Sequence, residues 1–344
     1  MGSICYTAII TPFYNDAVDK EGLEALVDFQ IENGINGILA VGTTGESPTL
    51  AWKEHNDVVR TVAQRTKGKC QCIAGAGSNN TKEAVSATEH AVAAGADAIL
   101  LVDPYYNGPS SLEIRREYIA PVAEAFPELP IIPYVIPGRT GAQLFPEDLA
   151  ILFDQYKNVN TVKEATGNLD NMKRTRQCCG DDYTILSGDD GMTFEMMNSP
   201  EIKASGVISV MTNIVPKAVV DMVSCLENGD DEKAKQIART LEPLFNLVTV
   251  ITKEKTPYGE VVCRARNPLA VKTLMQILGM PSGPCRQPLG KMNRAGLEVV
   301  LGAARSVQAE NPGLFEPLAN FFNVDIDARL NDASVVDRLC YEEG

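Results

Sequence analysis

Short apolar runs recur along the chain before residue 211, and each is followed by turn residues and then by a helix-like stretch. The runs lack strict polar alternation, which is typical of strands that are buried on both faces. Eight such runs alternating with helices predict an α/β fold, the (β/α)8 barrel. We expect its strands over residues 6–13, 37–43, 71–77, 98–104, 131–137, 160–165, 183–188 and 206–210.

A doubly wound open sheet is the rival arrangement of the same pattern. In its dinucleotide-binding form, such a sheet carries a phosphate-cradling G-x-G-x-x-G motif after the first strand. The first apolar run here, "AIITPF", is followed by no such motif. We therefore prefer the barrel.

The helical segments carry start and stop signals of their own. Residues 19–34 place apolar side chains on one face and end at Gly34, and Thr81 is suited to cap a helix that runs to residue 95. After the eighth run the pattern is mostly helical, which is more helix than a last barrel unit needs. We expect these later helices over residues 216–228, 231–253, 268–279 and 289–308, in addition to one over residues 146–155 between the fifth and sixth runs.

This excess of helix predicts three parts along the chain. We expect the barrel over residues 1–225, a C-terminal helical subdomain over residues 226–308 and a C-terminal extension over residues 309–344. Large apolar side chains in the extension predict that part of it packs on the rest of the molecule. These are Phe315, Phe321 and Phe322.

The chain is acidic, with a net charge of −14 at pH 7 and an isoelectric point near 4.7. This charge keeps the protein soluble and argues against nucleic acid or an anionic membrane as a partner. An anionic substrate would need a local positive group. No signal peptide, transit segment or bilayer-length apolar run is recognisable, so we expect a cytoplasmic protein without a membrane partner.

The chain has nine cysteines and only two histidines. Cys70 and Cys72 are separated by one residue, and Cys178 and Cys179 are adjacent. Neither spacing fits a zinc site. We expect free thiols in a reducing cytosol and no metal.

Polar residues follow several of the expected strands at the end where barrel enzymes place their active sites. The C-terminal ends of strands in this fold face one opening. The residues that should gather there are Thr43, Thr44, Tyr105, Tyr106, Asn107, Tyr134, Arg139, Lys163, Ser187, Gly188, Asp189 and Asp190.

Lys163 interrupts the run "NTVKEA", where a strand would be apolar. A buried ammonium costs several kcal/mol unless it is compensated, and the usual outcome is a lowered pKa. A neutral amine at a barrel mouth is a nucleophile toward a carbonyl and can form a Schiff base. The alternative is a lysine paired with Glu164 or another carboxylate, but adjacent residues on a strand point to opposite faces.

The residues around Lys163 favour the Schiff-base interpretation. Forming and dehydrating a carbinolamine each moves a proton at the amine, and a phenol such as that of Tyr134, one strand away, can carry it. The Thr43 hydroxyl is placed to relay that proton, and Arg139 in "PGRTG" offers a fork for a carboxylate. Tyrosines that only pack and an exposed loop arginine remain the alternatives from position alone.

Eight motifs resemble, in order and spacing, those of the dihydrodipicolinate synthase family, whose pyruvate-dependent Schiff-base relatives include N-acetylneuraminate lyase. The resemblance covers roughly residues 3–300 and implies a (β/α)8 barrel with a C-terminal helical subdomain. The motifs are "GTTGESPTL", "IAGAGSNNTKEA", "PYYNGPS", "PGRTG", "VKEATGNLD", "LSGDD", "GVISV" and "NPLAVK".

The resemblance implies a homotetramer, a dimer of dimers, that condenses pyruvate with aspartate-4-semialdehyde on the way to diaminopimelate and lysine. No cofactor is implied beyond a covalent imine of pyruvate on Lys163, which would tautomerise to an enamine. Tyr134 would donate and accept protons. Thr43 would link it to Tyr106, which in the family reaches in from a neighbouring subunit.

The resemblance also assigns the substrate contacts. Thr44 would hold the pyruvate carboxylate, and Gly188 and the Ile208 backbone would line that site. Arg139 would receive the carboxylate of the semialdehyde or of the cyclised product. The two adjacent threonines of "GTTGE" would thus divide the work, one passing protons and the other holding an anion.

Many members of the family show allosteric feedback inhibition by L-lysine at the interface of two subunits. Glu83 would neutralise an ammonium of such a ligand, and Tyr105 and Asn79 would hold its carboxylate. A solvated helix charge at Glu83 and a packing role for Trp52 are the alternatives. The positions that match this site are Ser47, Pro48, Trp52, His55, Asn79, Glu83 and Tyr105.

Two other functions stay open. One is another pyruvate-dependent class I aldolase or lyase, such as N-acetylneuraminate lyase or a 2-keto-3-deoxy sugar acid aldolase. The other is a non-catalytic barrel that binds or regulates and forms no imine. The synthase activity is favoured because sugar-acid lyases have Ser for the first Thr of "GTTGE" and no counterpart of Arg139.

The sequence departs from the family pattern at two places. Val135 and Ile136 follow Tyr134 where the family usually has Asn and Val. Thr161 and Val162 precede Lys163 where a small residue is usual. Neither change touches a reacting group, so each affects only the fine shape of the pocket.

Overall fold

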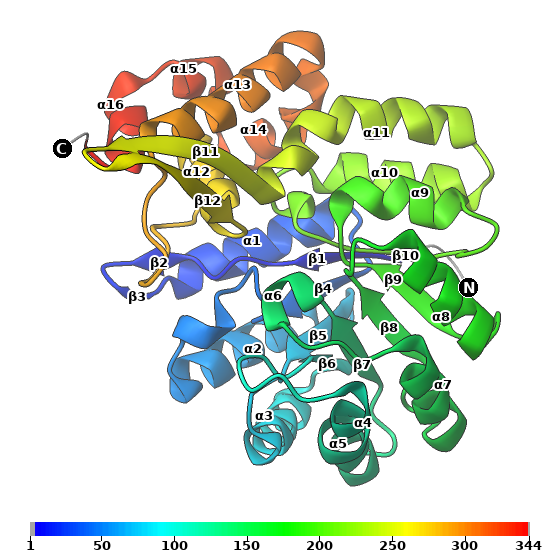
Figure 1. Ribbon diagram of the computed structural model, residues 1–344. Helices are drawn as coiled ribbons and strands as arrows, with labels where there is room; N and C mark the ends of the chain where they lie inside the picture. Colours follow the sequence, from blue (N-terminus) through cyan, green and yellow to red (C-terminus); the bar gives the residue numbers. More distant parts are fainter. Residues whose placement is uncertain (1–3, 343–344) are drawn as a thin grey trace.

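The computed structural model describes residues 4–342. Eight parallel strands close into a barrel in the order β1-β10-β9-β8-β7-β6-β5-β4 (Figure 1). This confirms the predicted (β/α)8 fold. The strands are β1 (Ile4–Ala8), β4 (Gly37–Ala40), β5 (Gln71–Gly75), β6 (Ala98–Val102), β7 (Ile131–Val135), β8 (Thr161–Glu164), β9 (Thr184–Ser187) and β10 (Gly206–Ser209).

Each strand is shorter than the apolar run that predicted it, and the trimmed residues become loops at the barrel mouth. After β4, Val41 takes a φ of 50°, in the left-handed region, so the chain leaves the strand before Thr43. After β7, Pro137 starts the short helix α6 (Pro137–Thr140). The first run also ends early, because Phe13 belongs to a separate hairpin of β2 (Phe13–Tyr14) and β3 (Ala17–Val18).

Helices cover the outside of the barrel and follow the predicted segments closely. Asn80, rather than Thr81, caps the third of them, because its side-chain oxygen accepts from the Lys82 backbone N–H. The helices up to the eighth strand are α1 (Lys20–Glu32), α2 (Trp52–Thr66), α3 (Thr81–Ala94), α4 (Ser111–Glu113), η2 (Ile114–Ile119), α5 (Ala120–Ala125), α7 (Pro146–Gln155), α8 (Leu169–Cys179) and α9 (Thr193–Asn198).

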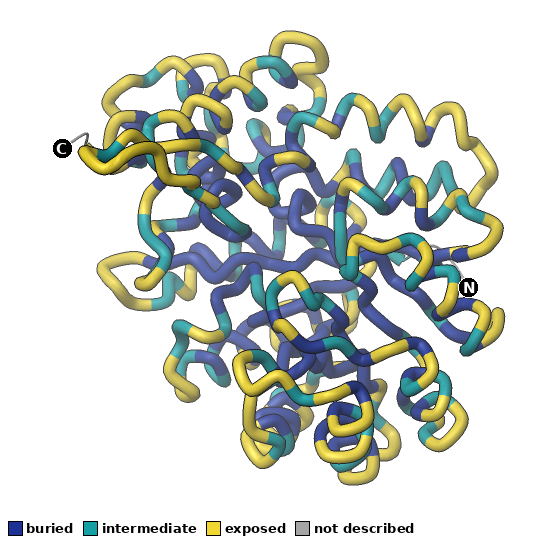
Figure 2. The backbone as a smooth tube through the Cα atoms, in the orientation of Figure 1, coloured by how far each residue is buried: buried dark blue, intermediate teal, exposed yellow. Residues whose placement is uncertain are grey.

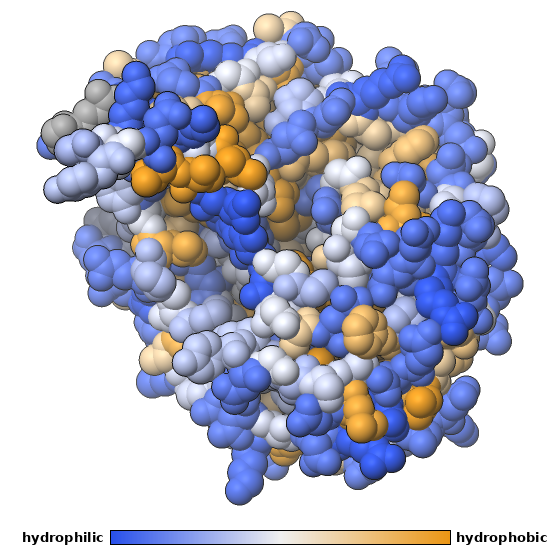
Figure 3. All heavy atoms as spheres, in the orientation of Figure 1, coloured by the Kyte–Doolittle hydropathy of each residue, from blue (hydrophilic) through white to orange (hydrophobic). Residues whose placement is uncertain are grey.

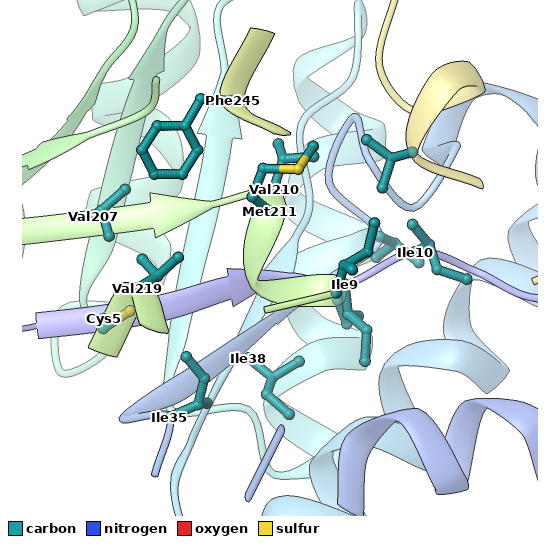
Figure 4. Close-up of a cluster of buried hydrophobic side chains, with 14 of the residues drawn as sticks. Cys5, Ile9, Ile10, Ile35, Ile38, Val207, Val210, Met211, Val219 and Phe245 are labelled. Carbon is teal, nitrogen blue, oxygen red and sulfur yellow. The ribbon is translucent and has the colours of Figure 1, made fainter. Parts of the chain in front are cut away.

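Apolar side chains fill both sides of the strand cylinder. The larger cluster lies between strands and helices, where Val219 of α10 (Pro216–Glu227) and Phe245 of α11 (Asp231–Phe245) face residues of β1 and β10 (Figure 4). The tube in Figure 2 shows the strands as the buried centre of the molecule. A second cluster lies inside the barrel and consists of Tyr6, Ala8, Leu39, Ile73, Ala98, Leu100, Ile132, Tyr134, Leu186 and Ile208.

The C-terminal part contains a hairpin that the sequence did not predict. Instead of a helix over residues 231–253, the helix ends at Phe245 and a two-stranded antiparallel sheet follows. The run "TVIT" is β-branched and apolar, which favours a strand once the turn around Gly259 brings a partner back. The elements are α10 (Pro216–Glu227), α11 (Asp231–Phe245), β11 (Thr249–Thr256), β12 (Gly259–Arg266), α12 (Leu269–Ile277) and α13 (Arg294–Glu310).

The last residues fold onto the preceding helices. Phe315 is fully buried, and the rings of Phe321 and Phe322 each lie 5.3 Å from the ring of Phe29 in α1, centroid to centroid. Arg329 donates to the carbonyl oxygen of Ile277 at the end of α12, at 2.7 Å. The segment includes α14 (Glu316–Phe322), α15 (Ile326–Leu330) and α16 (Ala333–Val336). The three-part division of the chain stays a prediction.

A buried ion pair joins α12 to the loop after β4. Lys272 Nζ lies 2.6 Å from Glu46 Oε1, and both side chains are almost completely shielded from solvent. The ammonium also donates to the carbonyl oxygens of Thr11 at 3.0 Å and Pro284 at 3.1 Å. The other carboxylate oxygen accepts from the Arg286 backbone N–H at 2.8 Å. Every proton of the ammonium therefore has an acceptor.

Replacing Lys272 by Met should lower the free energy of unfolding by about 3–5 kcal/mol, because the Glu46 carboxylate would stay buried without its counterion. Urea denaturation measures this change. Lys235→Met on the exposed face of α11 is the control and should leave stability within about 0.5 kcal/mol. The double variant Glu46→Gln/Lys272→Met should recover part of the loss. A loss below about 1 kcal/mol for Lys272→Met would contradict the role of the pair.

Candidate active site

Lys163 and Tyr134 lie side by side inside the barrel mouth. They are direct partners in the register of β7 and β8, so their side chains point to the same, inner face. Lys163 is 4% exposed, and its Nζ lies 4.3 Å from the centre of the Tyr134 ring. The structure thus brings together the two residues that the sequence singled out for imine chemistry.

The surroundings of Lys163 favour a neutral amine. Burial lowers its pKa to about 7, the Arg139 charge adds to that effect, and the Asp190 carboxylate opposes it. Within residues 4–342 no carboxylate comes within ion-pair distance of this amine. Glu164 points the other way, accepting from the Thr166 N–H and the Asn171 side chain. The alternative of a Lys163–Glu164 ion pair is therefore wrong.

Tyr134 keeps its proton at neutral pH. Burial raises its pKa to about 12, while the Arg139 charge and a hydrogen bond with the Thr43 side chain act in the opposite direction. A phenol in this state can donate to an oxygen atom on a neighbouring carbon and take the proton back. The predicted contact between Thr43 and Tyr134 is present.

The absence of a side chain at Gly188 makes room for the side chain of Lys163. A Cβ at this position would lie 3.1 Å from Lys163 Cε and 2.8 Å from the Ala165 Cβ. Any larger residue would therefore push against the lysine side chain or the next loop. Ile208 is fully buried in the inner cluster on β10.

Asp190 is a site residue that sequence reasoning named only as part of a polar run. It is buried, and its carboxylate accepts from the Ser209 hydroxyl and from the backbone N–H groups of Val210 at 2.9 Å and Met211 at 3.2 Å. Burial raises its pKa to about 6. It fixes the loop after β10, and its negative charge raises the pKa of Lys163 against the effect of burial. The two adjacent aspartates in "GDD" were the signal in the sequence that could have identified it.

Asn267 is the second residue that the sequence analysis missed. Its side-chain nitrogen donates to the Thr44 hydroxyl at 2.9 Å, and its backbone carbonyl oxygen accepts from Arg139 Nη2 at 3.2 Å. Thr44 accepts here, which leaves its own proton to donate to a ligand. One residue of the "NPLAVK" motif thus orients two predicted substrate contacts.

A cavity of about 220 Å³ opens beside Tyr134. Figure 3 shows a hollow on this face of the molecule. The cavity joins predicted catalytic residues to predicted regulatory ones. Its lining consists of Val41, Gly42, Thr43, Ser47, Pro48, Gly75, Gly77, Leu100, Val102, Tyr105, Tyr134, Ile136, Arg139 and Thr140.

The remaining predicted regulatory residues form small groups near this cavity. Asn79 Oδ1 accepts from the Tyr105 backbone N–H at 2.8 Å, and Glu83 accepts from the Ser78 hydroxyl. The ring of Trp52 lies 5.0 Å from that of His55, centroid to centroid.

His55 itself is buried, and burial lowers its pKa, so its imidazole is neutral at pH 7. In the part of the chain that the structure describes, no hydrogen bond, ion pair or ring contact joins Trp52 and His55 to Glu83 or Asn79. The structure therefore brings the regulatory set into one region without assembling it into one site.

Tyr106 stands apart from the other predicted catalytic residues. Its side chain is 93% exposed, and its φ of 80° lies in the left-handed region that bulky residues rarely adopt. It is not among the residues that line the cavity beside Tyr134 and Thr43. A strained backbone that projects an aromatic ring into solvent suits contact with another molecule.

Residues 4–342 contain no group of three or more His, Cys, Asp or Glu side chains placed to hold a metal ion. The nine cysteines, all inside this range, are free thiols. None of the helices in the described part of the chain is both long and apolar enough to cross a bilayer.

Residues 2–303 match the model of the dihydrodipicolinate synthetase family. The chain belongs to this family. The family expected from the motifs is therefore confirmed. A relative from Methanococcus vannielii, a 4-hydroxy-tetrahydrodipicolinate synthase by name, is 42% identical over 287 residues, covering 83% of this chain and 92% of its own length.

Solved structures of the family share the fold. The 4-hydroxy-tetrahydrodipicolinate synthase of Methylacidiphilum fumariolicum SolV superposes with a TM-score of 0.82 at 35% identity, covering 92% of this chain and 100% of that one. The DHDPS of Cyanidioschyzon merolae, crystallised with lysine bound, gives a TM-score of 0.80 at 33% identity and covers 89% of this chain and 98% of that one.

The lowered pKa of Lys163 predicts a pH profile for imine formation. Below pH 7 the amine is protonated and loses its nucleophilic lone pair, so the trapping rate should fall about tenfold per pH unit and level off above pH 8. Pyruvate with cyanoborohydride, followed by peptide mass spectrometry, measures the Lys163 adduct against exposed Lys157 as an internal control. A midpoint above pH 9 would contradict the desolvated amine.

Proposed function

We propose that this chain is a 4-hydroxy-tetrahydrodipicolinate synthase. It would condense pyruvate, held as an enamine on Lys163, with L-aspartate-4-semialdehyde in diaminopimelate and lysine biosynthesis. The observation that carries this proposal is the desolvated Lys163 amine beside the protonated Tyr134 phenol, in a chain whose named relatives carry this activity.

The first stage is imine formation. The neutral Lys163 amine attacks the keto carbon of pyruvate, and the resulting hydroxyl leaves as water after taking a proton from Tyr134. The Thr43 hydroxyl, hydrogen-bonded to the phenol, resupplies that proton. Thr44, oriented by Asn267, donates to the pyruvate carboxylate. The residues thus separate proton transfer from anion binding.

The second stage forms the carbon–carbon bond. Loss of a methyl proton turns the imine into an enamine, whose terminal carbon attacks the aldehyde carbon, and the aldehyde oxygen takes up a proton. The carboxylate of the semialdehyde lies against Arg139, which is half-buried at the cavity wall. The semialdehyde amine then attacks the imine carbon, closes the ring and displaces Lys163 as a free amine.

Among the alternatives, the sugar-acid lyases fit the cavity less well. Their substrates carry a chain of hydroxyl groups, and eight of the fourteen residues that line this cavity are glycines or have apolar side chains. Arg139 facing the same space favours a substrate with a second carboxylate. A non-catalytic barrel leaves the desolvated Lys163 without an explanation, because a binding protein has no need of a buried neutral amine.

The purified protein should form 4-hydroxy-tetrahydrodipicolinate from pyruvate and aspartate-4-semialdehyde, read out with a coupled reductase. Lys163→Arg should lower kcat by at least about a thousandfold, because a guanidinium forms no imine. Lys157→Arg is the matched control and should keep the rate. Equal or faster turnover with N-acetylneuraminate or a 2-keto-3-deoxy sugar acid would overturn the substrate assignment, and absence of any Lys163 adduct would overturn both enzymes.

We also propose a cytoplasmic homotetramer whose subunits exchange Tyr106. The exposed ring and left-handed backbone of this residue support insertion into a neighbouring subunit next to Thr43. L-Lysine as an inhibitor is supported by the lysine-bound relative from Cyanidioschyzon merolae and by Glu83, Asn79 and Tyr105 in one region of this chain. Neither proposal requires a cofactor or a metal.

Light scattering of the purified protein should give a mass near four times 37.2 kDa. A monomeric mass would count against the tetramer.

Millimolar L-lysine should slow turnover of the enzyme. Glu83→Gln should raise the half-inhibitory concentration of lysine about tenfold, because the carboxylate that faces its ammonium is lost. Glu89→Gln on the same helix is the control. An unchanged rate at about 10 mM lysine, which would nearly saturate a site with a Kd of about 1 mM, would count against lysine as an inhibitor.

A further inference from the structure

A second hollow, of about 190 Å³, lies outside the barrel cavity and continues it. The two spaces share Ile136 and Arg139 as lining residues, so the Arg139 side chain borders both. The outer wall comes from the hairpin that the sequence did not predict. The complete lining consists of Ile136, Gly138, Arg139, Thr249, Ile251, Arg264 and Arg266.

The register of the hairpin fixes which face turns toward this hollow. Ile251 pairs with Arg264, and Thr249 pairs with Arg266, so these four side chains share one face. The opposite face carries buried Val250 and packs on α13, where Thr252 donates to the Asn293 side chain at 3.0 Å. Burial of one face therefore forces the arginine-bearing face outward, over the barrel mouth.

Arg139, Arg264 and Arg266 form a positive cluster without acidic partners in the described part of the chain. Arg266 Nη1 donates to the Gly138 carbonyl oxygen at 2.8 Å, and Arg139 Nη2 donates to the Asn267 carbonyl oxygen at 3.2 Å. Burial lowers the pKa of Arg139, and the Arg266 charge acts in the same direction. Both guanidiniums line the same hollow.

The charge of this cluster is opposite in sign to the net charge of the chain. In a chain with a net charge of −14, six arginines lie within 4 Å of a carboxylate, as Arg294 does with Asp337, and none of the three in this cluster is among them. Unneutralised guanidiniums at the edge of a cavity focus a positive potential there. Figure 3 shows strongly hydrophilic side chains next to the central hollow, below the apolar surface of the upper lobe.

We propose that Arg264 and Arg266 form, with Arg139, an outer carboxylate-binding vestibule that draws the anionic aldehyde substrate into the barrel cavity. This inference rests on the proposed function and adds two specificity-determining residues to it. The ligand class is a small aliphatic carboxylate of four to five carbons, which the apolar side chain of Ile251 contacts while the arginines hold its charge.

The two hairpin arginines should act differently from pyruvate-binding residues. Pyruvate is fixed deeper, at Lys163 and Thr44, and reaches its site without a second carboxylate contact. The vestibule therefore affects capture of the aldehyde, and its contribution should weaken as salt screens the charges. A merely structural role for Arg266, holding α6 through Gly138, would instead change both substrates at every ionic strength.

The test uses the full-length enzyme and the variants Arg264→Gln, Arg266→Gln and their combination. We expect kcat/KM for aspartate-4-semialdehyde to fall about threefold in each single variant and about tenfold in the double variant at low salt. The KM for pyruvate should stay unchanged, and the differences should shrink at 0.5 M NaCl. Lys255→Gln, the same charge loss near the hairpin tip, is the matched control and should stay within about 1.5-fold.

Three readouts keep this proposal separate from the proposed function. Pyruvate trapping at Lys163 should be the same in native enzyme and in all variants. Arg266→Lys should retain most of the aldehyde capture, because it keeps the charge, and calorimetry with glutarate as an unreactive probe should show weaker binding in the double variant. The vestibule would be overturned if the native enzyme traps pyruvate at Lys163 but the double variant keeps the same kcat/KM for the aldehyde. It would also be overturned if the variants lose pyruvate binding in parallel. If the native protein traps no pyruvate, the proposed enzyme function itself would be overturned.

Discussion

The buried pair of Lys272 and Glu46 holds the active-site loop to the C-terminal part of the chain. Glu46 has a left-handed backbone conformation two residues after Thr44, and Lys272 reaches it from α12. The neighbouring motif residue Asn267 orients Thr44 from the same side. The barrel mouth is therefore shaped by residues more than 200 positions later in the sequence. The pair fixes Glu46, whose backbone N–H donates to the Thr43 carbonyl oxygen at 3.1 Å, in the loop that carries both threonines.

Two buried lysines in one protein illustrate how the surroundings decide charge. Lys272 has a carboxylate and two carbonyl oxygens around its nitrogen, which favour the ammonium form against the desolvation that lowers its pKa. Lys163 has the Tyr134 ring beside its nitrogen and only the Asp190 charge to favour the ammonium, so burial dominates and lowers its pKa. The same side chain is thus a structural cation at one place and a nucleophile at the other.

The sequence predicted the barrel because its strands are continuous apolar runs, and it predicted the main site because Lys163 breaks such a run. The prediction failed where the local sequence pattern favours one structure and a partner distant in the sequence stabilises another. The helix expected through residue 253 ends at Phe245, because β11 gains its stability only from pairing with β12, which lies farther along the chain. Asp190 and Asn267 were missed as individual site residues because their importance comes from the groups they contact, and single positions in a sequence carry no such information.

The lone tryptophan of this chain lies in the region where the regulatory residues gather. Trp52 is 42% exposed and rests edge-on against the neutral ring of His55. Because the chain has no second tryptophan, the fluorescence excited at the red edge of the protein absorption band comes from Trp52 alone, in the first turn of α2. The molecule thus contains its own optical probe at the rim of the barrel, and a ligand settling beside this helix can be followed in solution without any label.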